Sequence, residues 1–120
     1  VYHKAYRDPD VPNRPIRHFH GFSVLFSHTP ERHKNDLPDD PDPVELIERR
    51  QIDVFCHGHT HIPLLELRSD VLVVNPGNLR ENDRKHSPSF AVLRFEADRV
   101  EATLFDALSH APFRTLTHKR

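Results

Sequence analysis

A stretch in the middle of the chain combines residue types and spacing that suit metal binding. Residues 55–63 read Phe-Cys-His-Gly-His-Thr-His-Ile-Pro, and an apolar run leads into them. Residues two apart on an extended backbone point to the same side, so we expect His59 and His61 to project together from the end of a strand. Imidazole is the commonest metal ligand near neutral pH. The stretch therefore predicts a metal site, while strand-end histidines without a ligand explain a single His-x-His pair equally well.

His28 is a third candidate ligand, because it also follows an apolar run. Residues 22–27 predict a strand, and Pro30 ends it shortly after His28 because proline cannot continue a central strand. A second strand is predicted over residues 52–57, directly before the Gly-His-Thr-His sequence. Both sets of histidines are thus expected where a buried strand gives way to a loop.

The connection between these two strands decides whether the candidate ligands meet. Residues 43–50 predict a short amphipathic helix: Asp42 can cap its N-terminus, Pro43 suits the first helical position and Glu45 completes a capping box. If this helix is a crossover, the two strands are parallel and their carboxyl ends share one edge of the sheet. Ligands bind at that edge in open α/β sheets. A capping or hydrogen-bonded loop role for His28 remains the alternative.

The other segments are rich in predicted strands. Apolar runs separated by turn residues predict three hairpins, formed by residues 16–19 with 22–27, 64–67 with 71–74, and 90–95 with 99–105. Residues 1–15 contain three prolines and are expected to be irregular, and residues 106–120 are expected to form a loose tail. Because one short helix cannot cover such a sheet, we expect the fold to be incomplete.

Composition limits the classes of function. The chain has 120 residues, of which 36% are hydrophobic and 29% charged, and a formal net charge of −1. This balance gives no basic field for nucleic acid, and no apolar run is long enough to cross a bilayer. Cys56 is the single cysteine, which favours a cytoplasmic setting. Since Val1 stands at the first position, we expect the chain to be the later part of a longer protein.

Three features together resemble a known family. Gly58-His59-Thr60-His61, the downstream Asn75-Pro76-Gly77 and the apolar strand ending in His28 are similar to the C-terminal half of calcineurin-like metallophosphoesterases, nearest to the small single-domain phosphodiesterases. The resemblance spans residues 18–105. It implies an α/β fold, the C-terminal part of a metallophosphoesterase-type β-sandwich flanked by helices, strand-rich with one short helix. Residues 16–105 would then be the C-terminal half of that domain, within a single partial domain over residues 1–120.

The resemblance also implies a chemistry. In such a family His28 and His59 would bind one metal ion and His61 a second one, and a hydroxide bridging the two ions would attack a small phosphate ester. Mn²⁺, Fe, Zn²⁺ or Ni²⁺ would suit these ligands. His57 has no counterpart in the family motif and is not assigned as a ligand. Membrane association is not expected, and nucleic acid is not an expected partner.

Half of the family's site has no match in this sequence. The N-terminal half of these enzymes carries Asp-x-His, Gly-Asp and Gly-Asn-His/Asp motifs, including the histidine that assists the leaving group, and none of them occurs upstream of His28. The catalytic residues therefore stay unassigned. Three neutral imidazoles without carboxylates cannot charge-balance two divalent ions, so we expect little or no esterase activity from this chain alone. The missing half, or a second copy of the chain, is the expected partner.

Two other interpretations remain open. A non-catalytic scaffold with the same fold would use its exposed strands to bind proteins. A cupin-like protein with one metal ion would also fit part of the pattern, because Glu66 follows His59 and His61 at the spacing of a cupin motif. The cupin hypothesis requires an all-β barrel, which the predicted crossover helix at residues 43–50 argues against.

Overall fold

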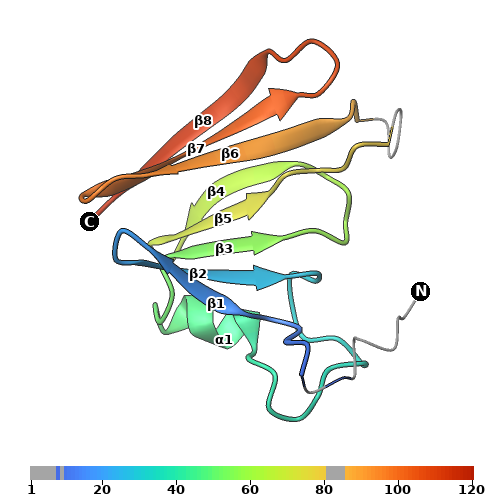
Figure 1. Cartoon of the computed structure of the whole chain (residues 1–120), viewed down its shortest axis with the longest axis vertical. Helices are drawn as coiled ribbons and strands as arrows, with labels where there is room; N and C mark the ends of the chain where they lie inside the picture. Colours follow the sequence, from blue (N-terminus) through green and yellow to red (C-terminus); the bar gives the residue numbers. More distant parts are fainter. Residues whose placement is uncertain (1–7, 9, 81–85) are drawn as a thin grey trace.

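The computed structural model describes residues 8, 10–80 and 86–120, which form two β-sheets stacked face to face with one helix beneath the larger sheet (Figure 1). The five-stranded sheet has the order β1-β2-β3-β5-β4, and the three-stranded sheet has the order β6-β7-β8. The elements are β1 (Ile16–Phe19), β2 (Phe22–Ser27), α1 (Pro43–Glu48), β3 (Val54–His57), β4 (Leu64–Arg68), β5 (Val71–Asn75), β6 (Ser89–Phe95), β7 (Arg99–Asp106) and β8 (Pro112–Lys119). In this described part, no helix is long and apolar enough to cross a membrane.

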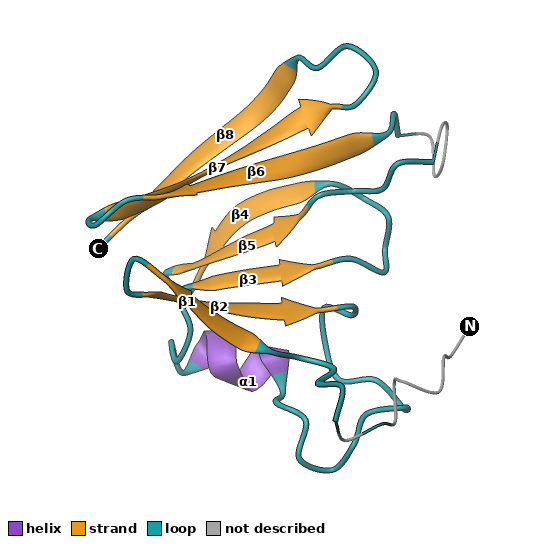
Figure 2. Cartoon of the chain, in the orientation of Figure 1, coloured by secondary structure: helices purple, strands orange, loops and turns teal. Residues whose placement is uncertain are grey.

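The centre of the larger sheet is parallel. Strand β2 pairs with β3 in parallel, with Val24 opposite Val54 and Ser27 opposite His57, and β3 pairs with β5 in parallel. Helix α1 is therefore the predicted crossover, and it lies against the outer face of this sheet (Figure 2). The parallel arrangement overturns the cupin interpretation, because it excludes an antiparallel barrel. The Glu66 carboxylate, which that interpretation needed as a metal ligand, pairs with Arg68 instead.

The main core lies between the two sheets. Its buried side chains come from the inner faces of both: Phe22, Val24, Val54, Leu65, Leu72 and Val74 from the larger sheet, and Val100, Ala102 and Leu104 from β7. The alternation of buried and less buried residues along β7 is the period of two that a strand with one buried face requires. The three predicted hairpins are all present, with ends within one residue of the prediction.

Helix α1 covers a second, smaller core. Asp42 caps the helix by accepting a hydrogen bond from the backbone N–H of Val44, and Pro43 occupies the first turn. Ile47 belongs to a buried cluster with Leu25, Phe55, Val71 and Val73 of the sheet and with Ile52, which precedes β3. The helix ends at Glu48, two residues earlier than predicted, because Arg50 adopts a left-handed backbone conformation that a helix cannot continue.

The prediction of a loose tail over residues 106–120 is wrong. Residues 112–119 form β8, which pairs antiparallel with β7 along its length. Arg114 donates a hydrogen bond from Nε to the carbonyl oxygen of Leu65, at 2.8 Å, and so ties this strand to β4 of the other sheet. The sequence did not indicate this strand, because Leu116 is its only aliphatic side chain. Backbone pairing with β7 supplies the remaining stabilisation. The described residues of the N-terminal segment, 8 and 10–15, contain no strand, as predicted, and residues 1–7 and 9 lie outside the description.

The packing of the core predicts that truncating two leucines will have different effects on stability. Leu104 is 1% exposed between the sheets, whereas Leu108 is 65% exposed in the loop after β7. We expect Leu104→Ala to lower the free energy of unfolding by about 2–5 kcal/mol, through lost apolar contact and a residual cavity. Leu108→Ala, the matched control, should change it by less than about 0.5 kcal/mol. Urea unfolding followed by circular dichroism measures both, and equal effects would contradict this packing.

Candidate metal centre

The parallel strands bring the predicted ligands to one edge of the larger sheet. Because Ser27 lies opposite His57, the residues that follow them, His28 and Gly58, are also neighbours. The backbone N–H of Gly58 donates to the carbonyl oxygen of His28 at 3.1 Å, which extends the pairing beyond the strands. A Cβ added at Gly58 would meet the carbonyl oxygen of His28 at 3.8 Å, which is ordinary van der Waals contact. The candidate centre therefore sits at the carboxyl ends of β2 and β3, as the crossover predicted.

Two of the three predicted ligands meet directly. His28 Nε2 lies 3.3 Å from His59 Nδ1, and the two ring centroids are 5.1 Å apart with the rings nearly perpendicular. Two nitrogens bound to one tetrahedral Zn²⁺ at about 2.0–2.1 Å are themselves about 3.3 Å apart. Both side chains are exposed, so the space between them is open to solvent. This pair fits part of the coordination shell of one ion.

The backbone conformation of the segment that carries His59 and His61 differs from the one predicted from the sequence. Strand β3 ends at His57, and both His59 and His61 have positive φ angles, of 69° and 65°. These two histidines therefore belong to a tight turn, and the expected projection from one face of a strand is wrong. Positive φ is unusual for a residue with a side chain, so other contacts must hold the turn.

Asn75 supplies those contacts. Its side chain is fully buried at the end of β5, and its Nδ2 donates to the carbonyl oxygen of Gly58 at 3.2 Å and to Oγ1 of Thr60 at 2.9 Å. Its Oδ1 accepts from the backbone N–H of Gly77 at 3.0 Å. The Asn75-Pro76-Gly77 sequence thus has a physical role, since it clamps the Gly-His-Thr-His turn from the neighbouring strand.

The third predicted ligand does not complete the set. His61 is half-buried in the same turn. Within residues 8, 10–80 and 86–120, no group of three or more His, Cys, Asp or Glu side chains is arranged to hold a metal ion. The assignment of a second ion to His61 stays a prediction.

His33 joins the candidate centre although the sequence gave no reason to single it out. It lies in the proline-rich loop after β2, and its ring centroid is 6.1 Å from that of His59, again nearly perpendicular. Desolvation first, and then the neighbouring imidazoles of His59, His33 and His61, lower the pKa of His28. The lowered pKa favours the neutral imidazole of His28, whose lone pair can bind a metal ion.

A buried arginine fixes the loop that carries His33. The guanidinium of Arg14 donates from Nε to Ser27 Oγ at 2.9 Å and from Nη1 to Asp36 Oδ2 at 2.8 Å. The further acceptors are the carbonyl oxygens of Pro41 and Glu31 and the Oγ1 of Thr29. All five N–H groups of an arginine are used in this way. The Arg14 and Asp36 side chains are 1% and 3% exposed, so they form a buried ion pair beside the candidate centre.

His57 takes no part in the pair of ligands. It is buried at the end of β3, its ring stacks on Phe55 with centroids 5.1 Å apart, and its Nδ1 donates to the carbonyl oxygen of Gly58 at 3.1 Å. Burial lowers its pKa, and the contact with Gly58 opposes that effect. His57 is therefore still not assigned as a ligand.

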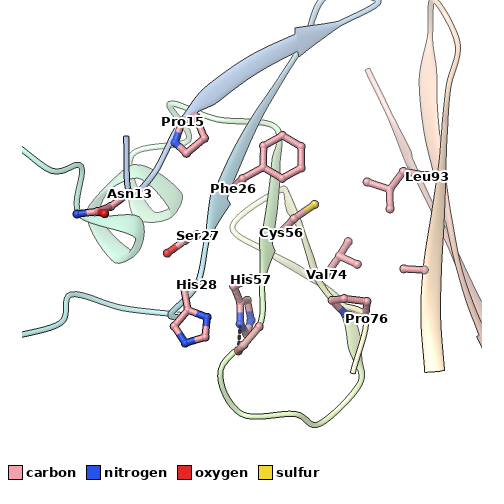
Figure 3. A pocket seen from close by; sticks show the side chains of 12 residues that line it. Asn13, Pro15, Phe26, Ser27, His28, Cys56, His57, Val74, Pro76 and Leu93 are labelled. Atoms are coloured by element: carbon pink, nitrogen blue, oxygen red, sulfur yellow. Dashed lines mark hydrogen bonds between the residues drawn. The ribbon is translucent and has the colours of Figure 1, made fainter. Parts of the chain in front are cut away.

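An apolar crevice of about 510 Å³ opens next to the histidines. In Figure 3, Phe26 and Cys56 of the larger sheet face Leu93 of β6 across it, with His28 and His57 at one end. The remaining lining residues are Asn13, Pro15, Ser27, Gly58, Val74, Pro76 and Ala91. The crevice is therefore bounded by both sheets, at the edge where the candidate ligands lie.

Comparisons with known proteins agree with this geometry. Residues 2–98 match the family model of the calcineurin-like phosphoesterase superfamily domain. The probable metallophosphoesterase YsnB of Bacillus subtilis (strain 168) is 35% identical over 54 residues, which are 45% of this chain and 32% of that protein. Vacuolar Protein Sorting 29 from Cryptosporidium parvum superimposes with a TM-score of 0.67 at 22% identity, over 94% of this chain and 62% of that one. Wild-type Vps29 from Entamoeba histolytica, in complex with Zn²⁺, gives 0.62 at 17% identity, over 89% and 61%.

These matches differ in what they establish. The structural likeness confirms the predicted α/β sandwich, strand-rich with one short helix. At these identities it shows the fold alone. The chain spans 32% of the length of the curated relative and 62% and 61% of the two structures.

The buried ion pair predicts a pH dependence of stability. Burial would raise the pKa of Asp36, but hydrogen bonds from Arg14 and from the backbone of His33, with the charges of Arg14 and Arg32, together hold it below its ordinary value. The pair therefore stabilises the fold above about pH 4, the unfolded-state pKa, and this contribution is lost as the pH falls through the folded-state pKa. We expect Asp36→Asn to lower the free energy of unfolding by about 3 kcal/mol at pH 7, because Arg14 stays buried without its partner.

Urea unfolding at pH 7 and at pH 3 tests this prediction. The loss between the two values should be smaller in Asp36→Asn than in the wild type. Asp39→Asn, at an exposed aspartate of the same loop, is the matched control and should follow the wild type. An Asp36→Asn variant as stable as the wild type at pH 7 would contradict the role of the pair.

The histidine pair predicts one zinc ion per chain. Isothermal titration with Zn²⁺ should show a single site, and His59→Ala should weaken it by about tenfold or more because one of two imidazole ligands is lost. His18→Gln, on the exposed face of β1, serves as the control. Unchanged zinc affinity in His59→Ala would show that the ion binds elsewhere.

Proposed function

Because this chain belongs to the calcineurin-like phosphoesterase superfamily, we propose that it is the C-terminal portion of a metal-dependent enzyme that hydrolyses phosphate esters. The single observation that carries the proposal is the His28–His59 pair, whose ring nitrogens are 3.3 Å apart at the carboxyl ends of parallel strands. The ordinary alternative, a hydrogen bond between two exposed loop histidines, does not account for the buried Asn75 that clamps the turn.

Each residue of the centre has a defined task in this proposal. His28 and His59 hold one divalent ion, and His61 contributes to a second. Bound metal ions would supply Lewis acidity and an activated water for attack on phosphorus. Zn²⁺, Mn²⁺, Fe and Ni²⁺ are the candidate metals, and the zinc complex of a Vps29 shows that a protein of this fold can take Zn²⁺. A cytoplasmic setting remains part of the proposal.

The proposal requires carboxylates from outside the described residues. Imidazoles are neutral ligands and cannot balance the charge of two divalent ions, whereas Asp and Glu can. A segment that carried these carboxylates would bind in the crevice. On β2, Phe22 and Val24 are buried, but Phe26, two residues further along the same face, is 37% exposed and lines the crevice. The apolar face of the larger sheet thus continues past the cover that the smaller sheet gives it.

A scaffold without catalysis is the second candidate, and an exposed surface favours it. On the outer face of the smaller sheet, Phe90 and Phe105 stack with ring centroids 5.2 Å apart. Val92 and Phe113 on the same sheet are 49% and 53% exposed. Clustered apolar side chains on a surface are typical of protein interaction sites. The two candidates differ in whether the histidines or this face carries the function.

Hydrolysis of bis-p-nitrophenyl phosphate with added Mn²⁺ tests the proposal. We expect the natural full-length protein to hydrolyse it and the 120-residue chain to show little or no activity. His59→Ala in the full-length protein should lower kcat/KM by about 100-fold or more, because a metal ligand is lost. His18→Gln should leave the rate unchanged.

Two outcomes would overturn parts of this picture. Robust hydrolysis by the 120-residue chain would refute the proposal that this chain contains only part of the catalytic site. A full-length protein that binds the metal but hydrolyses no phosphate ester would leave the scaffold as the function.

A further inference from the structure

The segment before β1 carries a buried arginine whose guanidinium reaches the residues on both sides of a predicted metal ligand. We propose that Arg14 is a positioning residue for the metal centre, because it holds the main chain on either side of His28 and so keeps this imidazole beside His59. This inference rests on the proposed function, because it concerns the affinity of the same centre for its ion. Arg14 lies outside the Gly-His-Thr-His and Asn-Pro-Gly motifs, in the segment of residues 1–15 that the sequence predicted only to be irregular.

The contacts of Arg14 with the two residues beside His28 are the first support. Its Nε donates to Oγ of Ser27 at 2.9 Å, and its Nη2 donates to Oγ1 of Thr29 at 3.0 Å. Ser27 is the last residue of β2, so one guanidinium is bonded to both sequence neighbours of the predicted ligand. The guanidinium is a rigid planar fork, which fixes the two acceptors relative to each other. The main chain at His28 is therefore held at a defined place beyond the end of β2.

Two further hydrogen bonds connect these hydroxyl groups to the main chain. Ser27 Oγ donates to the carbonyl oxygen of Thr29 at 2.7 Å, and Thr29 Oγ1 donates to the carbonyl oxygen of Glu31 at 2.7 Å. Each hydroxyl thus accepts from Arg14 and donates to a carbonyl oxygen. Thr29 is 2% exposed, so solvent is a poor substitute for the guanidinium at this position. A buried polar network in which every member is satisfied is rigid.

The position of His28 affects metal binding because two ligands must meet one ion. Nε2 of His28 lies 3.3 Å from Nδ1 of His59, which is close to the separation of two nitrogens on one tetrahedral Zn²⁺. Both side chains are exposed, so packing orients them less than it orients a buried side chain. A binding site holds its ligands to within about 0.5 Å only when supporting groups fix them. Arg14 gives this support to His28, as Asn75 does to the turn that carries His59.

The other hydrogen bonds of the guanidinium anchor Arg14 itself. Nη1 donates to Asp36 Oδ2 at 2.8 Å and to the carbonyl oxygen of Pro41 at 3.2 Å, and Nη2 also donates to the carbonyl oxygen of Glu31 at 3.1 Å. A lysine at this position would keep the positive charge opposite Asp36. Its three donors share one nitrogen, however, and cannot match acceptors spread around a planar fork. Arg14→Lys therefore separates the ion pair from the positioning role.

Zinc affinity is the first test. Isothermal titration with Zn²⁺ measures the dissociation constant of the 120-residue chain in the wild type and in Arg14→Lys, and circular dichroism checks that each is folded. We expect Arg14→Lys to weaken zinc binding by about tenfold or more, the usual effect of removing a group that orients a metal ligand. Leu104→Ala is the control for lost stability, because Leu104 is buried between the sheets and has no contact with the centre. It should bind Zn²⁺ within about twofold of the wild type.

A matched pair of variants at Thr29 isolates the contact beside His28. Thr29→Val keeps the shape of the side chain but removes the hydroxyl that accepts from Arg14, whereas Thr29→Ser keeps a hydroxyl. We expect Thr29→Val to weaken zinc binding by about tenfold and Thr29→Ser to bind within about threefold of the wild type. This pair decides the question even where Arg14→Lys does not fold, because it leaves the Arg14–Asp36 ion pair in place.

The outcomes separate this inference from the proposed function. Equal zinc affinity in the wild type, Arg14→Lys and Thr29→Val would overturn the positioning role and leave the metal centre in place. An equal loss in Arg14→Lys and Leu104→Ala, or in Thr29→Val and Thr29→Ser, would also overturn it, because lost stability or altered packing would then be the cause. A wild type that binds no Zn²⁺ would overturn it together with the metal centre. Zinc binding that depends on Arg14, in a full-length protein without hydrolytic activity, would support the inference and overturn the hydrolase.

Discussion

The parallel pairing of β2 with β3 is the constraint on which the rest of this structure depends. It sets Ser27 opposite His57, so that the segments following β2 and β3 leave the sheet side by side. These segments bring His28 and His59 to the same place. A shift of one residue in this register would reverse the faces of one strand and separate the ligands. Helix α1 enforces the parallel direction by carrying the chain back across the outer face of the sheet, where Ile47 is buried. The same burial that stabilises the fold thus aligns the candidate centre.

The loops at this edge are held by buried polar groups. Asn75 fixes the Gly-His-Thr-His turn from one side, and Arg14 fixes the loop of His33 from the other. Such groups contribute to uniqueness more than to net stability, because burying a charge or an amide is itself costly and is offset only when every hydrogen bond is made. Both side chains meet that condition through several partners. The side chains of His28 and His59 remain exposed while hydrogen bonds hold the neighbouring loops, which suits a site that must exchange ligands with solvent.

The sequence predicted the architecture better than the details of the centre. Apolar runs, turn residues and the capped helix located three of the hairpins and the crossover, because each of these depends on local chemistry. Strand β8 was missed since its pairing with β7 and the link from Arg114 to Leu65 are not visible in composition. The closeness of His28 and His59 was predicted from their place after apolar strands. The turn geometry of His59 and His61, and the approach of His33, depend on contacts from residues far away in the chain, and no local pattern encodes them.

The smaller sheet leaves part of the apolar face of the larger sheet uncovered, and this uncovered part lies beside the candidate metal centre. Phe26 and Cys56 continue the inner faces of β2 and β3, yet they border a crevice instead of a closed core. Exposed apolar surface of this kind favours association with another segment. The same end of the sandwich carries neutral imidazoles, which need negatively charged ligands beside them to bind two divalent ions. Because His28 lines the crevice, a segment that filled it would lie next to His28. In the proposed enzyme, therefore, a single segment that filled the crevice and carried carboxylates would meet both requirements.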